Sequence, residues 1–546
     1  MRDRVWRRCV FQLIVMTLFV AGCVLSGDAV RAGEPELRET DDVTKRLDQQ
    51  QQLIERLLKL TEQQHHELDQ LRRTFVLERT SPNELFDAIP PAPLLGDGFE
   101  SVAPLSDSPR QLTGGEDPSA NPFTADQARE LDRRIANHPV KPPVLQNGLR
   151  FGYADGFTLT SPEGLKLNTK EAPFVLRVNG RLQMRYTNFD SHGPNRDENN
   201  FEFERAFLIF TGTVYTPDLA YHIKLDADSD ETEGVDLLDW YTTYDVGHGV
   251  FDCAPGAFGI KAGKWKMPFH RARQEASHQF QLVDRAMASE FFDINRSIGV
   301  GMFGRFDLGE RAINWETAVF NGFQTQRFVP GRAGELDRNF GYATRVYSDL
   351  IGEWGKDGEP DLSYHDAPAV RVGAATAFTR INKLDGLREF FVPRVTDSGK
   401  TLASLLPVAV SEFDECLYSV DANFKYRGSA VLSEYYFRSI THFAGAPVSD
   451  LFDHGFMLQA GHFVWRDKLE VATRWSRIVG NSGTLGAADR SADEITGGGT
   501  WYIRGNNVKV VFDATHLNGA PINSTAVNIR PGDAGWLFRT QFQILF

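Results

Sequence analysis

The chain ends on the sequence GWLFRTQFQILF, residues 535–546, in which two kinds of side chain alternate. Successive side chains of a β-strand point to opposite faces, so these residues would form two different faces. One face would hold Trp536, Phe538, Thr540, Phe542, Ile544 and Phe546, and the other Leu537, Arg539, Gln541, Gln543 and Leu545. The first set is apolar and aromatic and the second is largely polar, which predicts a strand lying between an apolar and a polar environment.

The same alternation recurs from residue 174 onward. Leu176, Val178 and Leu182, for example, oppose Arg177 and Arg181. Sixteen such segments are predicted, at approximately residues 174–190, 201–215, 220–229, 236–248, 257–267, 297–308, 312–321, 338–350, 369–380, 413–425, 429–439, 453–464, 468–480, 493–504, 508–518 and 535–546. The segment 201–215 fits least well, because apolar residues stand on both of its faces.

The number and spacing of these segments favour a membrane barrel over a soluble sandwich, which would also alternate but with its apolar faces inward. The number is even, and tight turns such as Thr216-Pro217-Asp218 alternate with long loops such as 268–296 and 381–412. A closed barrel also leaves no unpaired strand edge in lipid. We therefore predict an all-β fold, a 16-stranded antiparallel transmembrane β-barrel in which the strand ending at Phe546 pairs with the one beginning near Phe174.

A long preface precedes the predicted barrel. Residues 1–32 have the basic start and apolar run of an export signal. Two processing sites are possible. The first is cleavage after Val30-Arg31-Ala32, and the second is lipidation at Cys23, the last residue of the lipobox-like sequence Val20-Ala21-Gly22-Cys23. A seven-residue apolar period predicts a periplasmic α-helical coiled coil at 40–79. Residues 80–147, with eleven of the 26 prolines, form a linker, and the barrel occupies 148–546.

Composition narrows the classes of partner and compartment. The formal net charge of −14 argues against nucleic acid, which needs a concentrated basic surface. Beyond residue 30 no apolar run is long enough for a membrane helix. After the export signal only Cys253 and Cys416 remain, and we expect them at opposite ends of the barrel wall, too far apart to bond.

The polar faces of the predicted strands carry more basic than acidic residues. The basic residues are Arg177, Arg181, Arg185, Lys224, Arg345, Arg371, Lys425, Arg438, Arg474, Arg504, Lys509 and Arg539, and the acids are Asp226, Glu316, Asp421, Glu434, Glu470, Glu494 and Asp513. Charged side chains on the lipid side are costly, so these side chains are predicted to line a lumen with a net positive charge. Arg177, Arg181 and Arg185 form the clearest group, followed by Lys264, Lys266, His270, Arg271 and Arg273 at the entry to loop 268–296.

Several motifs, in order along the chain, resemble the phosphate-selective porins of the O and P type. They include Gly180-Arg181-Leu182-Gln183, Glu204-Arg205-Ala206-Phe207, Tyr221-His222-Ile223-Lys224-Leu225-Asp226, Leu238-Asp239-Trp240-Tyr241, Gly263-Lys264-Trp265-Lys266-Met267-Pro268-Phe269, Ser297-Ile298-Gly299-Val300 and Asn321-Gly322, with Leu469-Glu470-Val471-Ala472-Thr473-Arg474-Trp475-Ser476 and Gly499-Thr500-Trp501-Tyr502-Ile503 near the end. The resemblance covers roughly residues 150 to 546. It implies a trimeric barrel whose third outer loop, here about 268–296, folds inward, with basic side chains guiding anions.

The sequence thus predicts an outer-membrane channel for the passive diffusion of small anions such as phosphate. The proposed anion path comprises Arg177, Arg181, Arg185, Lys224, Lys264, Lys266, Arg271, Arg345, Arg371, Arg474 and Arg539. The alternative is a structural anchor whose coiled coil binds the cell wall or a periplasmic partner. We predict neither an enzyme nor a cofactor, because the hydrolase motifs HExxH and GxSxG are absent, and no metal site, because Asp226-Ala227-Asp228 begins like a calcium loop but Glu231 and Leu237 break the pattern.

Overall fold

The computed structural model describes residues 150–153, 156–160, 174–227, 234–309, 311–325, 328, 332, 334–391, 394–487 and 489–546. The chain divides into two units, Met1–Asn137 and His138–Phe546, and the described residues all belong to the second. The predicted export signal, coiled coil and linker, at 1–32, 40–79 and 80–147, lie outside the described residues. They stay predictions, as does the anchoring role that depends on them.

The described chain is almost entirely β-structure. Its strands are β1 Arg150–Tyr153, β2 Phe157–Thr160, β3 Val175–Ser191, β4 Glu198–Val214, β5 Thr216–Asp226, β6 Asp236–Tyr244, β7 Phe258–Lys266, β8 Arg296–Leu308, β9 Arg311–Phe320, β10 Gly341–Ile351, β11 Ala369–Asn382, β12 Glu412–Tyr426, β13 Ser429–Ala444, β14 Leu451–Trp465, β15 Leu469–Val479, β16 Ser491–Arg504, β17 Val508–Asn518 and β18 Ala534–Leu545. Each of the sixteen predicted segments overlaps one of the strands β3 to β18, so the predicted strand order is confirmed.

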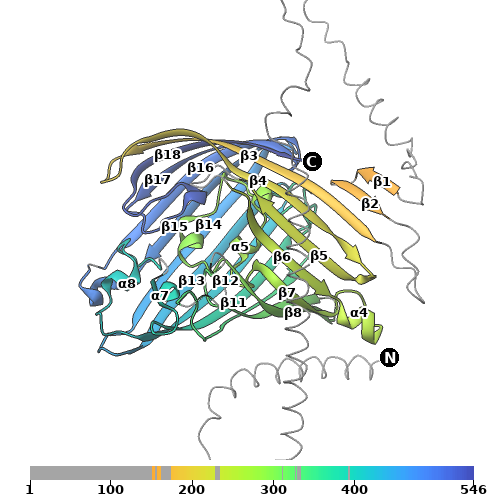
Figure 1. Ribbon diagram of the computed structural model, residues 1–546. Helices are drawn as coiled ribbons and strands as arrows, with labels where there is room; N and C mark the ends of the chain where they lie inside the picture. The colour runs from red at the N-terminus through yellow and green to blue at the C-terminus, as the bar shows by residue number, and fades with distance from the viewer. Residues whose placement is uncertain are drawn as a thin grey trace, which may run out of the picture. The chain divides into compact units, whose positions relative to one another are not determined.

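The strands β3 to β18 close into a barrel of 16 antiparallel strands (Figure 1). Each strand pairs with the next along the chain, and β18 pairs with β3 so that Gln541 lies opposite Arg185. Beyond the end of β18, the Phe546 and Gly180 backbones exchange hydrogen bonds of 3.0 and 2.7 Å. The predicted closure of the last strand on the first is therefore confirmed.

A short hairpin was not among the predicted strands. β1 pairs with β2, and β2 pairs with β3 from Val175 to Val178, on the stretch of β3 that lies beyond the end of β18. The hairpin thus supplies hydrogen-bond partners for part of the β3 edge that the last strand does not reach.

The two faces of the wall have the composition that the alternation predicts. On β18, Trp536 and Phe542 are 40% and 42% exposed on the outside, whereas Arg539 and Gln541 are 2% and 1% exposed on the inside. Exposed aromatic side chains lie near both ends of the wall, with Phe452 and Trp536 at one end and Trp465, Trp501 and Phe546 at the other. Outward apolar residues between two aromatic girdles are typical of a barrel that spans a lipid bilayer.

The connections differ between the two ends of the barrel. Tight turns join β4 to β5, β8 to β9, β12 to β13, β14 to β15 and β16 to β17 at the short-turn end, where Phe546 also lies, and long loops lie at the opposite, long-loop end. The tight turn predicted at 216–218 occurs one residue earlier. The chain reverses at Tyr215, whose φ is 62°, and Thr216 already belongs to β5. In outer-membrane barrels the short turns face the periplasm.

The poor alternation at 201–215 has a structural cause. The register between β3 and β4 shifts where Gln183 lies opposite Arg205 and Met184 opposite Phe203, so that Glu204 is an extra residue in β4. This β-bulge resets the alternation. Phe201 and Phe203 face outward before it, whereas Arg205 and Phe207 are buried inside after it.

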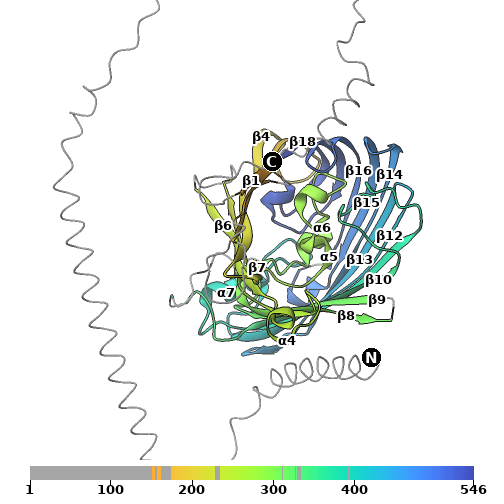
Figure 2. The ribbon, with the colours of Figure 1, turned by 90° about the vertical axis from the view of Figure 1, so that its right-hand side faces the viewer.

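Helices are short and lie in the connections. They are α4 Val246–Phe251, α5 Arg271–Gln274, η1 Ser277–Gln279, α6 Met287–Phe291, α7 Leu387–Phe391, α8 Leu402–Leu405, η2 Ser482–Leu485 and η3 Thr525–Val527. Figure 2 shows α5 and α6 inside the ring of strands. No helix in the described part of the chain has the length and apolar character needed to cross a membrane. Cys253 and Cys416 are both free, as predicted.

The loop 383–411 at the long-loop end has an apolar cluster of its own, in which Phe390, Leu402 and Phe413 are buried. Next to Phe390, the buried carboxylate of Glu389 accepts a 3.1 Å hydrogen bond from the backbone N–H of Asp337 and so joins this loop to the segment 321–340. Burial and the neighbouring Asp337 raise the pKa of Glu389 to about 7.

We predict that the closure of this loop depends on pH. Because the pKa of Glu389 is higher in the packed loop than in an open one, the stabilisation is greatest in acid and is lost as the pH rises through about 7. Hydrogen exchange of α7 amides, corrected for intrinsic rates, should be faster at pH 8 than at pH 6. Glu389→Gln should abolish the difference and Asp450→Asn, at an exposed residue of the same end of the barrel, should not. Equal exchange in the unmodified chain at both pH values would refute the prediction.

A second prediction concerns the outward face of the wall. Phe512, in the middle of β17, is 49% exposed. Phe512→Arg should destabilise the barrel by about 2–4 kcal/mol, because a guanidinium would face hydrocarbon, and Phe512→Leu should cost much less. Equilibrium refolding into lipid vesicles measures both changes. Equal stability of the two variants would mean that Phe512 faces water.

Candidate functional site

The loop between β7 and β8, residues 267–295, folds into the lumen and is called the constriction loop below. It carries α5 and α6 and matches the predicted inward loop at about 268–296. Its apolar side chains, including Phe269, Met287 and Phe292, are almost fully buried against the inner wall. The loop is therefore a packed part of the barrel interior.

Acidic side chains of the wall hold the backbone of this loop. Glu434 accepts hydrogen bonds from the backbone N–H groups of Arg271 and Ala272, at 2.7 and 3.0 Å. Asp513 accepts one from Val283 at 3.1 Å, and Glu494 one from Met287 at 2.5 Å. These acids come from β13, β16 and β17, so the loop lies against the β12–β18 side of the barrel. Four buried backbone N–H groups of the loop thus find their hydrogen-bond acceptors on this side of the barrel.

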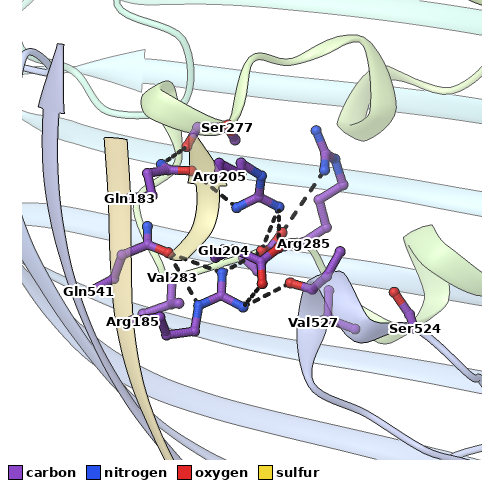
Figure 3. A network of polar contacts seen from close by, with 12 residues as sticks. Gln183, Arg185, Glu204, Arg205, Ser277, Val283, Arg285, Ser524, Val527 and Gln541 are labelled. Carbon is purple, nitrogen blue, oxygen red and sulfur yellow. Dashed lines mark hydrogen bonds and ion pairs between the residues drawn. The ribbon is translucent and has the colours of Figure 1, made fainter. Parts of the chain in front are cut away.

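A cluster of ionic contacts fastens the loop to β3 and β4 (Figure 3). Figure 3 labels Arg185, Glu204 and Arg205 of this cluster. Asp284 of the loop, fully buried, accepts 2.8 Å hydrogen bonds from both arginines. Arg185 also pairs with Glu204, the bulge residue, at 3.1 Å. The bulge therefore places the Glu204 carboxylate and the Arg205 guanidinium on the same inner face, where Arg205 contacts the loop and Glu204 pairs with Arg185 and Arg205.

The basic side chains on the β12–β18 side are held by carboxylates or by backbone carbonyls. Arg438 pairs with Asp453 at 2.6 Å, Arg474 with Glu494 at 2.6 Å and Arg539 with Asp513 at 2.9 Å, and the ammonium groups of Lys425 and Lys509 donate to the backbone carbonyls of Gly358 and Phe280. These residues stabilise the wall and the loop, and none of them except Arg438 lines a cavity described here. Arg504, also predicted for the lumen, is exposed at the turn after β16.

Two cavities remain open, lined mainly by the constriction loop and the β3–β9 wall, with residues of β10 and β11 completing the lower cavity and residues of β12 and β13 the upper one. The lower cavity, towards the short-turn end, has a volume of about 990 Å³ and the upper cavity about 860 Å³. Both are lined by His222, Tyr241, Lys261, Gln274 and Ala276, so the two cavities meet there. Together they form one passage along β3–β9.

The lining of the passage carries a net positive charge. Six Arg and Lys residues line the lower cavity against two acids, Glu275 and Glu316. Ten line the upper cavity against six acids. The basic residues of the upper cavity are Arg181, Arg205, Lys224, Lys261, Lys266, Arg273, Arg285, Arg296, Arg394 and Arg438. An excess of one sign in a narrow channel with low-dielectric walls raises the local concentration of the opposite ion.

Three of these cations have no carboxylate partner among the described residues: Arg181, Lys224 and Lys266. Arg181 donates to the hydroxyl of Ser277 at 3.0 Å, and Lys266 donates to the backbone carbonyls of Arg273 and Glu275 at 2.7 and 3.0 Å. The Lys224 ammonium lies 3.5 Å from the centroid of the Phe207 ring. Asp239, the nearby acid of β6, is held by a bidentate pair with Arg296. These three side chains therefore line the upper cavity without a carboxylate at ion-pair distance among the described residues.

Other residues of the predicted anion path lie in the lower cavity. Arg177 is exposed there, Arg345 pairs with Asp421 at 2.7 Å and Arg371 pairs with Asp349 at 2.6 Å. Arg271 lies 3.5 Å from Glu275. Arg177 thus adds an exposed charge to the passage, whereas the other three are partly compensated by acids.

Lys264 has a different position from the one predicted. Its ammonium donates to the backbone carbonyl of Leu237 at 2.6 Å, and it lies opposite the outward Trp240 on β6, outside the lining of both cavities. Lys261 lines the passage instead and pairs with Glu316 at 2.9 Å. Trp265, next to Lys264 in the chain, is buried on the inner face, and neighbouring residues of a strand point to opposite faces, so Lys264 lies on the outer face.

Comparisons with known proteins give the following similarities. Residues 176–344, which extend from β3 into β10, match the family model of the phosphate-selective porins O and P. No curated protein matches the chain. Similar solved structures include an anion-selective porin from Comamonas acidovorans (10% identity, 68% of this chain and 99% of that one, TM-score 0.45), OmpT of Vibrio cholerae (10%, 69% and 99%, 0.42) and the channel DcaP of Acinetobacter baumannii (8%, 70% and 99%, 0.43). With TM-scores below 0.5, these likenesses carry no conclusion about this chain.

The contacts of Asp284 lead to a prediction for the constriction loop. Asp284→Ala would leave the guanidinium groups of Arg185 and Arg205 short of a buried partner, which should weaken the docking of the loop by about 3–5 kcal/mol. The barrel should still form, and hydrogen exchange of residues 282–291 should accelerate. Removing Asp307, whose pair with Arg305 is largely exposed, should leave that exchange unchanged. Unchanged exchange in Asp284→Ala would contradict the assigned contact.

Proposed function

We propose that this chain, whose residues 176–344 match the family model of the phosphate-selective porins O and P, is a porin that lets small anions such as phosphate diffuse passively across an outer membrane. The observation that carries the proposal is the passage along β3–β9, in which Arg181, Lys224 and Lys266 have no carboxylate within 4.0 Å among the described residues. In this function the protein binds and releases ions and forms no covalent bond with them.

The arrangement of charges supports selection by sign. The acids that could offset the basic residues are taken up elsewhere, because Glu434, Glu494 and Asp513 hold the constriction loop and Asp239 pairs with Arg296. An anion that enters the upper cavity would meet ammonium and guanidinium groups at the wall. Lys266 binds the backbone carbonyls of Arg273 and Glu275 and so holds them away from the path. Guanidinium groups also bind oxoanions through two N–H donors, which favours phosphate-like ions.

The remaining parts of the proposal rest on the sequence. They are a homotrimer, an orientation with the short-turn end in the periplasm, and a coiled coil at 40–79 on the periplasmic side. The short turns support the orientation, and the pair of aromatic girdles supports the membrane-spanning position.

We predict that the purified chain, reconstituted in a planar bilayer under a salt gradient, gives a reversal potential of the sign expected for anion permeation. The triple variant Arg181→Gln, Lys224→Gln, Lys266→Gln should lower the ratio of anion to cation permeability by about tenfold, because it removes the uncompensated charges of the upper cavity.

A matched control removes three basic residues outside the passage, by Arg311→Gln, Arg466→Gln and Lys468→Gln, and should leave the ratio unchanged. A reversal potential that favours cations in the unmodified chain would refute the proposed selectivity. The absence of any conductance from a correctly folded barrel would favour the anchoring role.

A further inference from the structure

Two connections at the short-turn end are longer than tight turns: residues 245–257, which carry α4, and residues 352–368. Residues 352–368, between β10 and β11, contain several fully or nearly fully buried residues, among them Trp354, Glu359 and Asp361. Periplasmic turns of outer-membrane barrels are usually short and exposed. The burial of this connection means that it folds into the lumen from the end opposite to the constriction loop.

The two inward loops contact each other inside the barrel. The Glu359 backbone N–H donates to the carbonyl of Gln279 at 3.1 Å, and the Gln279 side chain donates to the carbonyl of Lys356 at 2.7 Å. The fit is tight at Gly358, where φ is +77° and an added Cβ would lie 2.3 Å from the Gln279 Cβ. Only glycine allows this approach without a shift of the backbone.

The wall behind the constriction loop also binds this connection. Lys425 of β12 donates to the Gly358 carbonyl at 2.8 Å, Asn506 to the Asp357 carbonyl at 2.9 Å, and Gln459 of β14 to the Glu359 carboxylate at 3.0 Å. Closer to the mouth, Asp361 accepts a 2.7 Å hydrogen bond from the backbone N–H of Gly428. These contacts come from strands and turns of the β12–β17 side of the barrel, which the constriction loop already covers.

The carboxylate of Glu359 faces a cation of the passage. One Glu359 oxygen lies 3.6 Å from the Arg271 guanidinium, which lines the lower cavity. Among the described residues the side-chain nitrogens of Arg271 make no hydrogen bond, so its charge is offset only by nearby carboxylates such as Glu359 and Glu275. The other Glu359 oxygen accepts from the Gln281 backbone at 3.1 Å, which fixes the carboxylate in place.

We propose that residues 352–368 form a second inward loop that closes the β12–β17 side of the lumen below the constriction loop, and that its Glu359 lowers the anion selectivity of the passage by offsetting Arg271. This inference rests on the proposed anion conduction. Without the loop, water would reach the underside of the constriction loop, and ions would find a second path beside the one along β3–β9.

Single-channel recording tests the charge of Glu359 separately from the position of the loop. Glu359→Gln keeps a hydrogen-bond acceptor for Gln281 and Gln459 but removes the charge beside Arg271, so the ratio of anion to cation permeability should rise severalfold. Glu353→Gln, an exposed residue of the same loop, is the control and should leave the ratio unchanged. An unchanged ratio in Glu359→Gln would overturn the assigned role of Glu359.

The position of the loop is tested by conductance alone. Gly358→Ala should push the loop away from Gln279 and raise the conductance, by up to about twofold if the second side of the lumen opens. Gly355→Ala is matched to it, because Gly355 has a φ of +78° but its added Cβ would meet only ordinary contacts at 3.6 Å and beyond. Equal conductance in both variants would refute the closing role. A channel without anion preference but with this conductance difference would refute the proposed function and leave the closing role standing.

Discussion

The fold depends on one constraint, which is that every backbone N–H and C=O group facing hydrocarbon needs a partner within the chain. The pairing of β18 with β3 meets this constraint by joining residue 545 to the start of the barrel, and it leaves no free strand edge along the wall. Closure also fixes which side chains face lipid and which face the lumen, so the charged residues of sixteen strands are concentrated in one enclosed space. The barrel interior must then either pair these charges or expose them to ions.

The interior does both, on opposite sides. Towards β12–β18 the carboxylates hold the constriction loop and the arginines pair with them, as Arg474 does with Glu494, so this side is filled and nearly neutral. Towards β3–β9 the loop leaves a passage in which Lys224 and Lys266 have no acidic partner among the described residues. The asymmetry follows from the loop, because the carboxylates that hold it, Glu434, Glu494 and Asp513, come from β13, β16 and β17 and form no ion pair with Lys224 or Lys266.

The sequence predicts the strands well, because side-chain alternation in a membrane wall is imposed by lipid on every strand and needs no long-range information. It fails where a bulge changes the face, as at Glu204, and where an aromatic residue lies on the inner face, as Trp265 does, so that Lys261 and not Lys264 lines the passage. It also cannot show which basic residues are neutralised, because the partners are distant in sequence: Asp284 lies 99 residues from Arg185. The inward position of 352–368 is hidden for the same reason.

The central claim is that one side of the lumen is open and the other is filled. Cysteine accessibility tests it directly, in a background where Cys253 and Cys416 are replaced by serine. Lys261→Cys, in the passage, should react rapidly with a charged water-soluble thiol reagent and change the channel current, whereas Lys509→Cys, behind the constriction loop and 1% exposed in the native chain, should stay unreactive in the folded barrel. Rapid modification at 509 with protection at 261 would contradict the account.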